Sequence, residues 1–179
     1  MGRLINSPLI TFSYFIKIYY HKYQIKSILI GSNVDTIGDY AFKNCDKLLS
    51  IEIPSTVTTI GGYVFYHCDS LRTVVWNTNA VADNPFNNCL NIQTLTFGDS
   101  VLKVQNNFMD GRSSLRTVSF GANVDTIGNN AFKGCQMQSV KVENGVGSIG
   151  NNAFRDCNQL STIGFVEPTN LKELKNLSN

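Results

Sequence analysis

Residues 34–45 read VDTIGDYAFKNC, and closely similar phrases return at residues 124–135 as VDTIGNNAFKGC and at residues 146–157 as VGSIGNNAFRDC. Each copy places Val, Ile-Gly, Ala-Phe and Cys at the same offsets. Self-similarity of this kind is the sequence signature of repeat proteins, in which one structural unit recurs along the chain. The three copies therefore predict a chain built from stacked coils.

The repeated phenylalanine gives the period of these coils. It recurs with spacings of 23, 21, 22, 24 and 22 residues, at Phe42, Phe65, Phe86, Phe108, Phe132 and Phe154. The period divides the chain into six coils, at residues 25–47, 48–70, 71–91, 92–114, 115–136 and 137–159. A partial seventh coil begins at Leu160. We number the coils one to seven in this order.

Each coil opens with a pattern that is typical of a short strand, such as LLSIEI at 48–53 and LRTVSF at 115–120. The fourth and sixth positions are apolar and lie on one side of a strand, and the third and fifth lie on the other. One coil cannot bury its apolar side alone, so neighbouring coils must stack and their strands become rungs of a parallel sheet. The sequence thus predicts an α/β or mainly β solenoid of about 22–23 residues per coil, with a parallel sheet on one face.

The repeated phrases resemble the BspA-type leucine-rich repeat, over residues 25 to about 165. The leading spacing Leu-x-x-Leu-x-Leu also fits a leucine-rich repeat better than a β-helix of hexapeptides. The resemblance implies a surface or secreted protein, of a family found in host-associated bacteria and parasitic protists, with adhesion as the expected role. It implies no binding residues, because the motif consists of core and turn positions that every member needs in order to fold.

The ends of the chain lie outside the repeat. Residues 1–24 form a predicted N-terminal cap or degenerate leader, residues 25–165 the solenoid, and residues 166–179 a C-terminal cap or tail. We favour the cap over a leader because the apolar run ends at Lys17 without a small-x-small cleavage site. Alternation with a period of two supports the cap as well, at Ile10, Phe12, Tyr14, Ile16, Ile18 and Tyr20.

The overall composition argues against several function classes. The chain has 42% hydrophobic and 16% charged residues, which is typical of a folded domain, and its formal net charge of +2 comes from scattered Lys and Arg. It has no basic cluster of the kind that binds phosphates or an anionic membrane. We therefore expect no nucleic-acid partner, no transmembrane segment and no cofactor.

The five cysteines occupy one repeated position, three residues after the repeat Phe: Cys45, Cys68, Cys89, Cys135 and Cys157. Stacked neighbours would lie about 4.8 Å apart, which exceeds the usual Cβ separation of a disulfide. The odd count also argues against full pairing. We favour a ladder of inert buried thiols, with disulfides or metal ligation as alternatives. Gly111 takes this position in coil four.

No other residue pattern predicts chemistry. His67 occupies a turn position that other coils fill with Asn44, Asn88, Asp110, Gly134 and Asp156. His21 has no partner at metal-ligand spacing, so no metal site is predicted. Among the outward strand positions Glu52 is the only acid, and glycoside hydrolysis needs a pair of carboxylates. We predict no catalytic residue, and hence not an enzyme.

Two features, Trp76 and coil three, allow both a structural and a functional interpretation. Trp76 aligns with core positions such as Ile53 and Phe120, so we favour burial over a role as a binding anchor. Coil three is short, carries Val81-Ala82 in place of Ile-Gly, and contains Pro85, which must end any local strand or helix. We favour drift in a tolerant turn over a functional loop there.

The outward face of the predicted sheet is the first candidate for binding. Its central position carries a hydroxyl in every coil, at Ser27, Ser50, Thr73, Thr94, Thr117, Ser139 and Thr162. A structural role in the strand stack is the favoured explanation for this column. The flanking positions vary, and solenoids bind partners on extended surfaces of this kind. The candidate partner-binding residues are Arg72, Thr73, Val75, Gln93, Thr96, Arg116, Ser119, Gln138 and Lys141.

Two functions therefore compete. The first is a non-catalytic interaction module, adhesin-like, which binds a protein or glycan through the sheet face and lies at the cell surface or is secreted. The second is a structural scaffold inside the cell, which is motivated by the lack of a clear signal and by five cysteines that suit a reducing compartment.

Overall fold

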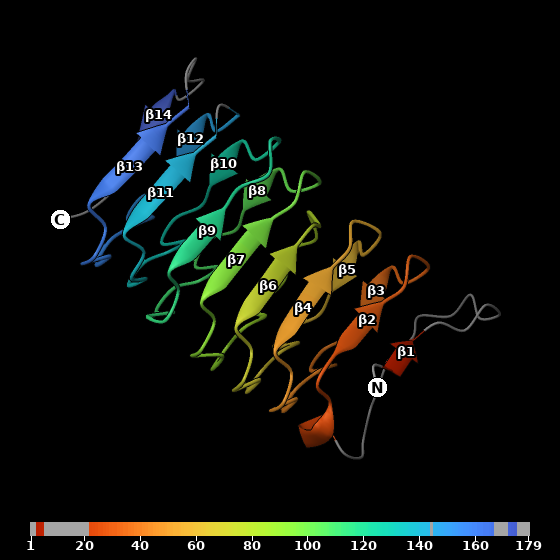
Figure 1. The fold of residues 1–179 in the computed structure, drawn as a ribbon. Coiled ribbons are helices and arrows are strands. Elements are labelled where there is room, and N and C mark those ends of the chain that lie inside the picture. Colours follow the sequence, from red (N-terminus) through yellow and green to blue (C-terminus); the bar gives the residue numbers. More distant parts are fainter. Residues whose placement is uncertain (1–2, 6–21, 144, 167–171, 175–179) are drawn as a thin grey trace. The chain divides into compact units, whose positions relative to one another are not determined.

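The computed structural model describes residues 3–5, 22–143, 145–166 and 172–174. Its regular elements are short strands, with a single 3-10 helix, η1 (Lys22–Gln24), among the described residues (Figure 1). All strand pairs given for these residues are parallel, as a solenoid requires. The predicted fold, a parallel-sheet solenoid with one strand at the start of each coil, is confirmed.

The chain forms two compact units, Met1–Asn91 and Ile92–Asn179. The boundary lies between coil three and coil four, so each unit contains whole coils. In the first unit the strands that open the coils, which we call the front strands, are β2 (Ile28–Ile30), β4 (Ser50–Ile53) and β6 (Thr73–Trp76). β1 (Arg3–Ile5) pairs with β2, and β4 pairs with β6. The back strands β3 (Thr36–Ile37) and β5 (Thr59–Ile60) pair with each other.

The second unit repeats this arrangement. Its front strands are β7 (Thr94–Phe97), β9 (Thr117–Ser119), β11 (Ser139–Val142) and β13 (Thr162–Phe165). Its back strands form one four-stranded sheet in the order β14-β12-β10-β8, from β8 (Lys103–Val104), β10 (Thr126–Ile127), β12 (Ser148–Ile149) and β14 (Glu173–Leu174). Each back strand pairs with its equivalent in the next coil, as Thr126 pairs with Lys103 and with Ser148.

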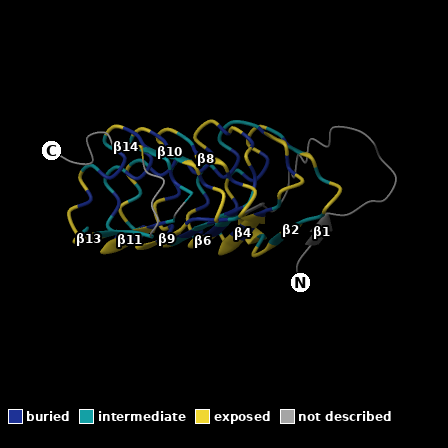
Figure 2. Cartoon of the chain, turned by 90° about the horizontal axis from the view of Figure 1, so that it is seen from above, coloured by how far each residue is buried: buried dark blue, intermediate teal, exposed yellow. Residues whose placement is uncertain are grey.

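The core lies inside the coils, between front and back strands (Figure 2). Alternation along the front strands puts Ile51 and Ile53 inside, and the residues between them outside. The repeat phenylalanines stack on one another within each unit. The ring centroids of Phe65 and Phe86 lie 5.4 Å apart at an interplanar angle of 11°, and those of Phe132 and Phe154 lie 5.6 Å apart at 9°. Stacked pairs of this kind contribute about 0.5–1.5 kcal/mol beyond the burial of their area.

Two residues per coil adopt the left-handed backbone conformation and turn the chain back toward the front strand. The first, which we call the leading turn residue, has φ between 43° and 57° and is Tyr40, Tyr63, Asn84, Asn107, Asn130 or Asn152. The second, four residues later, has φ between 58° and 75° and is Asn44, His67, Asn88, Gly111, Gly134 or Asp156. The prediction that His67 is a turn residue is therefore confirmed.

These turns correct the alignment of coil four. The left-handed residues Asn107 and Gly111 place Met109, and not Phe108, in the position of the repeat Phe. The amide of Met109 donates to the carbonyl of Ala131 at 2.7 Å, as the amide of Phe132 donates to Ala153 at 2.8 Å. Phe108 instead takes the place of the small residue before the Phe, where it is also buried. The prediction that Phe108 continues the ladder is wrong by one residue.

The same shift moves the cysteine position of coil four. The sequence predicts Gly111 in the cysteine position and Asp110 in the turn position of His67. The φ of Gly111, 75°, instead makes Gly111 the equivalent of His67. Arg112 occupies the cysteine position, and its amide donates to Met109, as that of Cys135 donates to Phe132. The error arose because Phe108 and Met109 are both apolar, so residue type alone could not distinguish the two alignments.

Coil three differs from its neighbours in its back segment, where the structure describes no strand between β6 and β7. Thr78 is buried there, and its hydroxyl donates to the carbonyl of Val57 at 2.5 Å. The same oxygen accepts the amide of Ala80 at 2.9 Å. The Thr78 hydroxyl thus satisfies a backbone carbonyl and a backbone amide in a segment that has no back strand. These hydrogen bonds let the shorter coil stack on coil two.

Most of the predicted N-terminal cap, residues 1–24, lies outside the described residues, as does most of the predicted C-terminal tail. In the described parts of these segments, β1 pairs with β2 and β14 pairs with β12. Among the described residues, no helix has the length and apolar character needed to cross a membrane.

Candidate recognition surface

On the outward face of the front strands in the second unit, equivalent side chains lie in register across the strand pairs β7–β9 and β11–β13. Thr94 lies opposite Thr117, and Ser139 opposite Thr162, which forms the hydroxyl column. Thr96 lies opposite Ser119 on the same strands. The candidate residues of this unit are exposed at Gln93, Arg116, Ser119, Gln138 and Lys141 and half-buried at Thr96. The structure therefore brings six of the nine candidate residues onto one face.

The other three candidate residues belong to the first unit. Arg72 and Thr73 are exposed, and Val75 is half-buried on β6. Thr73 pairs with Ser50, and Val75 pairs with Glu52 on β4. This face also carries two exposed leucines, Leu29 and Leu49, so it is more apolar than the face of the second unit.

The two cations on the face of the second unit have partners within the chain. Arg116 donates from Nη1 to the carbonyl of Ser113 at 2.6 Å, which fixes its side chain near the start of β9. Lys141 forms an ion pair with Glu143 at 3.0 Å. Both side chains are largely exposed, so these contacts orient the charges more than they neutralise them.

All five cysteines are buried and free, as expected for a thiol ladder. The sulfurs of Cys68, Cys89, Cys135 and Cys157 each donate to a carbonyl of the preceding coil, such as Cys68 to Phe42 at 3.2 Å and Cys135 to Met109 at 3.3 Å. Hydrogen bonds with the flanking cysteines and burial raise the pKa of the Cys68 thiol, and burial also raises that of Cys135. Burial raises the pKa of Cys157 to about 11. These thiols remain protonated near neutral pH, so they are poor nucleophiles.

Arg112 occupies the thiol position in the first coil of the second unit. Its Nη1 donates to the carbonyl of Asp110 at 3.1 Å, but its Nε is buried without a hydrogen-bond partner. An unpartnered buried donor is destabilising. The guanidinium thus brings more polar atoms than this position satisfies.

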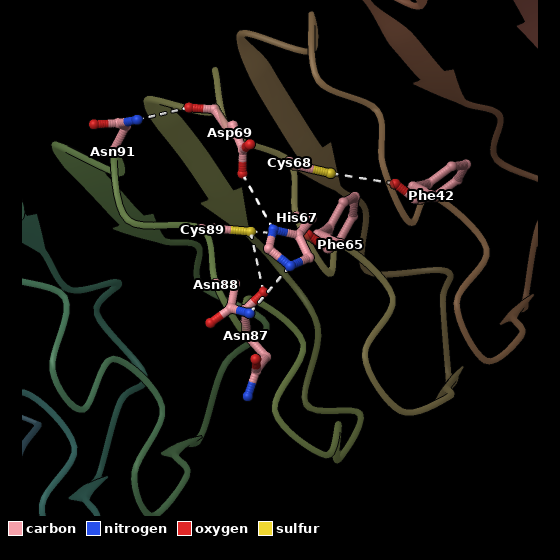
Figure 3. A network of polar contacts seen from close by, with 9 residues as sticks. All are labelled: Phe42, Phe65, His67, Cys68, Asp69, Asn87, Asn88, Cys89 and Asn91. Atoms are coloured by element: carbon pink, nitrogen blue, oxygen red, sulfur yellow. Dashed lines mark hydrogen bonds and ion pairs between the residues drawn. The ribbon is translucent and has the colours of Figure 1, made fainter. Parts of the chain in front are cut away.

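His67 forms a small polar network at the turn of coil two (Figure 3). Its Nδ1 lies 3.6 Å from Oδ1 of Asp69, and its Nε2 lies 3.3 Å from Nδ2 of Asn88 in the next coil. Asn91 donates to the carbonyl of Asp69 at 2.7 Å. The network joins coils two and three at their turns. The adjacent thiols of Cys68 and Cys89 donate to backbone carbonyls, so the histidine activates neither sulfur.

A group that sequence reasoning missed lies on the turns of the first unit. We call Tyr40, Lys43, Tyr63 and Tyr66 the tyrosine cluster. The rings of Tyr40 and Tyr63 stack, with centroids 5.6 Å apart and an interplanar angle of 8°. The ring of Tyr66 packs edge-on against that of Tyr63, with centroids 6.0 Å apart. The Lys43 ammonium lies 5.4 Å from the ring centroid of Tyr40 and 5.3 Å from that of Tyr66. Tyr40 is 46% exposed, and the other three members are half-buried.

The backbone at Tyr40 and Tyr63 makes this cluster unusual. Both are leading turn residues, a position that the other coils fill with Asn. The left-handed conformation costs a typical L-residue about 1–2 kcal/mol and is tolerated best by Asn, Asp and Gly. One stacked pair contributes about 0.5–1.5 kcal/mol, so it does not offset the strain of two tyrosines. The signal in the sequence was the replacement of Asn by Tyr at one repeat position, in two successive coils.

A family model for the BspA-type leucine-rich repeat region matches residues 16–82 and 79–178, with six copies of the repeat. The chain belongs to the BspA-type leucine-rich repeat family. The resemblance seen in the sequence is therefore confirmed. No curated protein matches the chain at a significant level.

Two solved structures of leucine-rich repeat proteins are similar to this family member. One, from Bacteroides ovatus, has 28% sequence identity and a TM-score of 0.73 over 83% of this chain and 38% of its own. The other, a leucine-rich cell surface protein from Faecalibacterium prausnitzii, has 29% identity and a TM-score of 0.57 over 74% of this chain and 43% of its own. The chain thus spans less than half the length of either protein.

Leucine-rich repeat proteins are generally protein-interaction modules, and they are typically not catalysts. Among the described residues, no group of three or more His, Cys, Asp or Glu side chains could hold a metal ion.

Proposed function

We propose that the chain is a non-catalytic interaction module that binds a protein partner on the outward face of its front strands. The observation that carries this proposal is the exposed face of the second unit, where equivalent side chains lie in register across β7 and β9 and across β11 and β13. The fold needs only the inward side of these strands. Residues such as Gln93, Arg116 and Lys141 are therefore free to vary with the partner.

The charge of this face narrows the class of partner. The described outward positions of β7, β9, β11 and β13 and the residues directly before them carry no acidic side chain, and they include Arg116 and Lys141. A partner with acidic groups spaced along its surface complements this face. Complementary charge speeds association and selects the partner more than it adds affinity.

We further propose that the module works at the cell surface or after secretion, in an adhesin-like role. The similarity to a cell surface protein of Faecalibacterium prausnitzii supports this location. Fractionation of the native host cells, with antibody detection of the protein, tests it. Recovery of the protein in the cytosol alone contradicts the surface location.

Binding of the full chain to immobilised extracellular matrix proteins tests the proposed face. We expect a double variant, Arg116→Gln with Lys141→Gln, to weaken binding by about threefold to tenfold, since each exposed charge pair contributes up to about 1 kcal/mol. Lys103→Gln on the back strand β8 is the matched control, because this lysine is exposed but faces away from the front strands. Equal losses for the double variant and the control would contradict the assignment of the face.

The alternative, an intracellular scaffold, draws support from the five free thiols, because disulfides are rare in reducing compartments. The same fractionation separates the two functions. A cytosolic protein that elutes with a stable intracellular complex would favour the scaffold.

A further inference from the structure

The turn edge of the first unit carries a second site, separate from the front strands. We propose that the tyrosine cluster binds an acidic side chain of a protein partner, with Lys43 supplying the positive charge and the tyrosines supplying hydroxyls and apolar surface. This site is additional to the proposed sheet-face function and does not depend on it.

Each of the four members of the cluster contacts two of the others. Tyr40 stacks on Tyr63, Tyr63 meets Tyr66, and the Lys43 ammonium lies near the rings of both Tyr66 and Tyr40. The rings hold the ammonium in place by attraction between the positive charge and the aromatic faces. A charge positioned in this way loses little side-chain entropy when a partner binds.

Lys43 has no carboxylate partner among the described residues. Two acids on the turns of coils one and two contact other groups. Asp39, which precedes Tyr40, accepts the amide of Gly62 at 2.7 Å, and Asp69 faces His67 at 3.6 Å. Lys43 is half-buried, and a partner carboxylate would supply the ion pair that it lacks among the described residues. Charge-assisted hydrogen bonds from Lys43 and the phenol hydroxyls suit such a group.

Folding does not account for the tyrosines. The leading turn residue is Asn in coils three to six, and in the second unit Asn130 donates to the side chain of Asn107 at 3.1 Å. Asn thus satisfies the turn and links neighbouring coils without a strained bulky side chain. Strained residues persist where another role requires them, and binding sites are a common place for them.

A peptide partner fits the cluster better than a sugar. The stack covers one face of Tyr40 and one face of Tyr63, and Lys43 lies over the rings of Tyr40 and Tyr66. These contacts leave fewer aromatic faces on which a sugar ring could stack. The amphipathic edges and hydroxyls of tyrosine are well suited to protein contacts, and Tyr is enriched among the residues that dominate interfaces.

The experiment measures binding of a synthetic peptide with alternating Glu and Leu to the full chain, by heteronuclear NMR titration. The matched peptide carries Gln in place of Glu, and free glucuronate tests an acidic sugar. The double variant Tyr40→Asn with Tyr63→Asn restores the residue of the other coils, and Lys43→Gln removes only the charge. Lys133→Gln is the control. Lys133 occupies the same repeat position as Lys43, but the leading turn residue of its coil is Asn130, whereas that of Lys43 is Tyr40.

We expect the acidic peptide to shift tyrosine-cluster resonances and the Gln peptide to bind at least about threefold more weakly. Lys43→Gln should weaken binding by about threefold to fivefold and the double tyrosine variant by about tenfold or more, while Lys133→Gln leaves it unchanged. The variants must keep the amide spectrum of the folded chain outside the cluster. The absence of peptide binding, equal binding of both peptides, or binding of glucuronate alone would overturn the proposal.

Discussion

The position of Arg112 in the thiol ladder leads to a prediction that tests the corrected alignment of coil four. We expect Arg112→Cys to stabilise the chain by about 1 kcal/mol. The substitution removes a buried, unpartnered Nε, whose cost is about 1–3 kcal/mol, and loses the hydrogen bond to the Asp110 carbonyl, which contributes about 0.5–1.5 kcal/mol. A small thiol also matches the equivalent Cys135, which is fully buried.

Gly111→Ala provides the opposite test. Gly111 has φ of 75°, and no atom lies within 4 Å of an added Cβ, so strain of the backbone is the only cost. We expect this variant to lose about 1–2 kcal/mol. If Gly111 instead held the thiol position, Ala there would be tolerated and Arg112→Cys would place a thiol in the turn.

Urea unfolding followed by circular dichroism at pH 7, with a reducing agent present, measures both variants against the parent chain. A change of 1 kcal/mol corresponds to a shift of about 2–4 °C in Tm for a chain of this size, so thermal unfolding gives a second readout. Destabilisation by Arg112→Cys together with no effect of Gly111→Ala would refute the corrected alignment.

Four further predictions concern the stability of the solenoid. Gly128→Ala should destabilise by about 1–3 kcal/mol in urea unfolding, because an added Cβ would lie 2.7 Å from the Asn106 amide nitrogen. Phe132→Ala, in the core stack, should cost about 3–5 kcal/mol, measured in the same way. Thr78→Val should cost about 1–3 kcal/mol, as two hydrogen bonds of its hydroxyl are lost; a neutral result would contradict its bridging role. Burial raises the pKa of Cys157 from 9.0 to about 11, so the folded chain retains a proton that the unfolded chain loses. This thiol should leave stability unchanged below pH 9 and lower it between pH 9 and 11. In unfolding curves recorded across this range, Cys157→Ala should make the fall less steep, while Cys68 and Cys135, whose pKa values are also raised, still contribute to it.

Much of the fold followed from periodicity. Alternation in the front strands predicted the buried positions of residues such as Ile51 and Ile53, and the alignment of Trp76 with them predicted its burial, which the structure confirms at 1% exposure. These inferences succeed because each coil contacts only its neighbours, so a position that is buried in one coil is buried in the next. The same logic correctly placed the five cysteines in the core.

Prediction failed where residue type did not identify backbone conformation. Phe108 and Met109 are both apolar, and only the left-handed turn at Asn107 and Gly111 shows which of them joins the ladder. The tyrosine cluster escaped notice for a related reason. Tyr40 and Tyr63 lie 23 residues apart in the sequence, and their stacking depends on the left-handed turn conformation and the ring orientations, which periodicity does not supply.

The sequence by itself determined the repeat, its period, the family, and which columns of side chains face the core, because burial recurs with the same spacing in every coil. Only the tertiary structure decided which residue of coil four holds the thiol position, and which side chains meet across neighbouring turns. The physical reason is that turn geometry and side-chain contacts between coils are set by backbone dihedrals and packing. Two neighbouring apolar residues, such as Phe108 and Met109, fit the sequence pattern equally well, but the turn geometry places only one of them in the position of the repeat Phe.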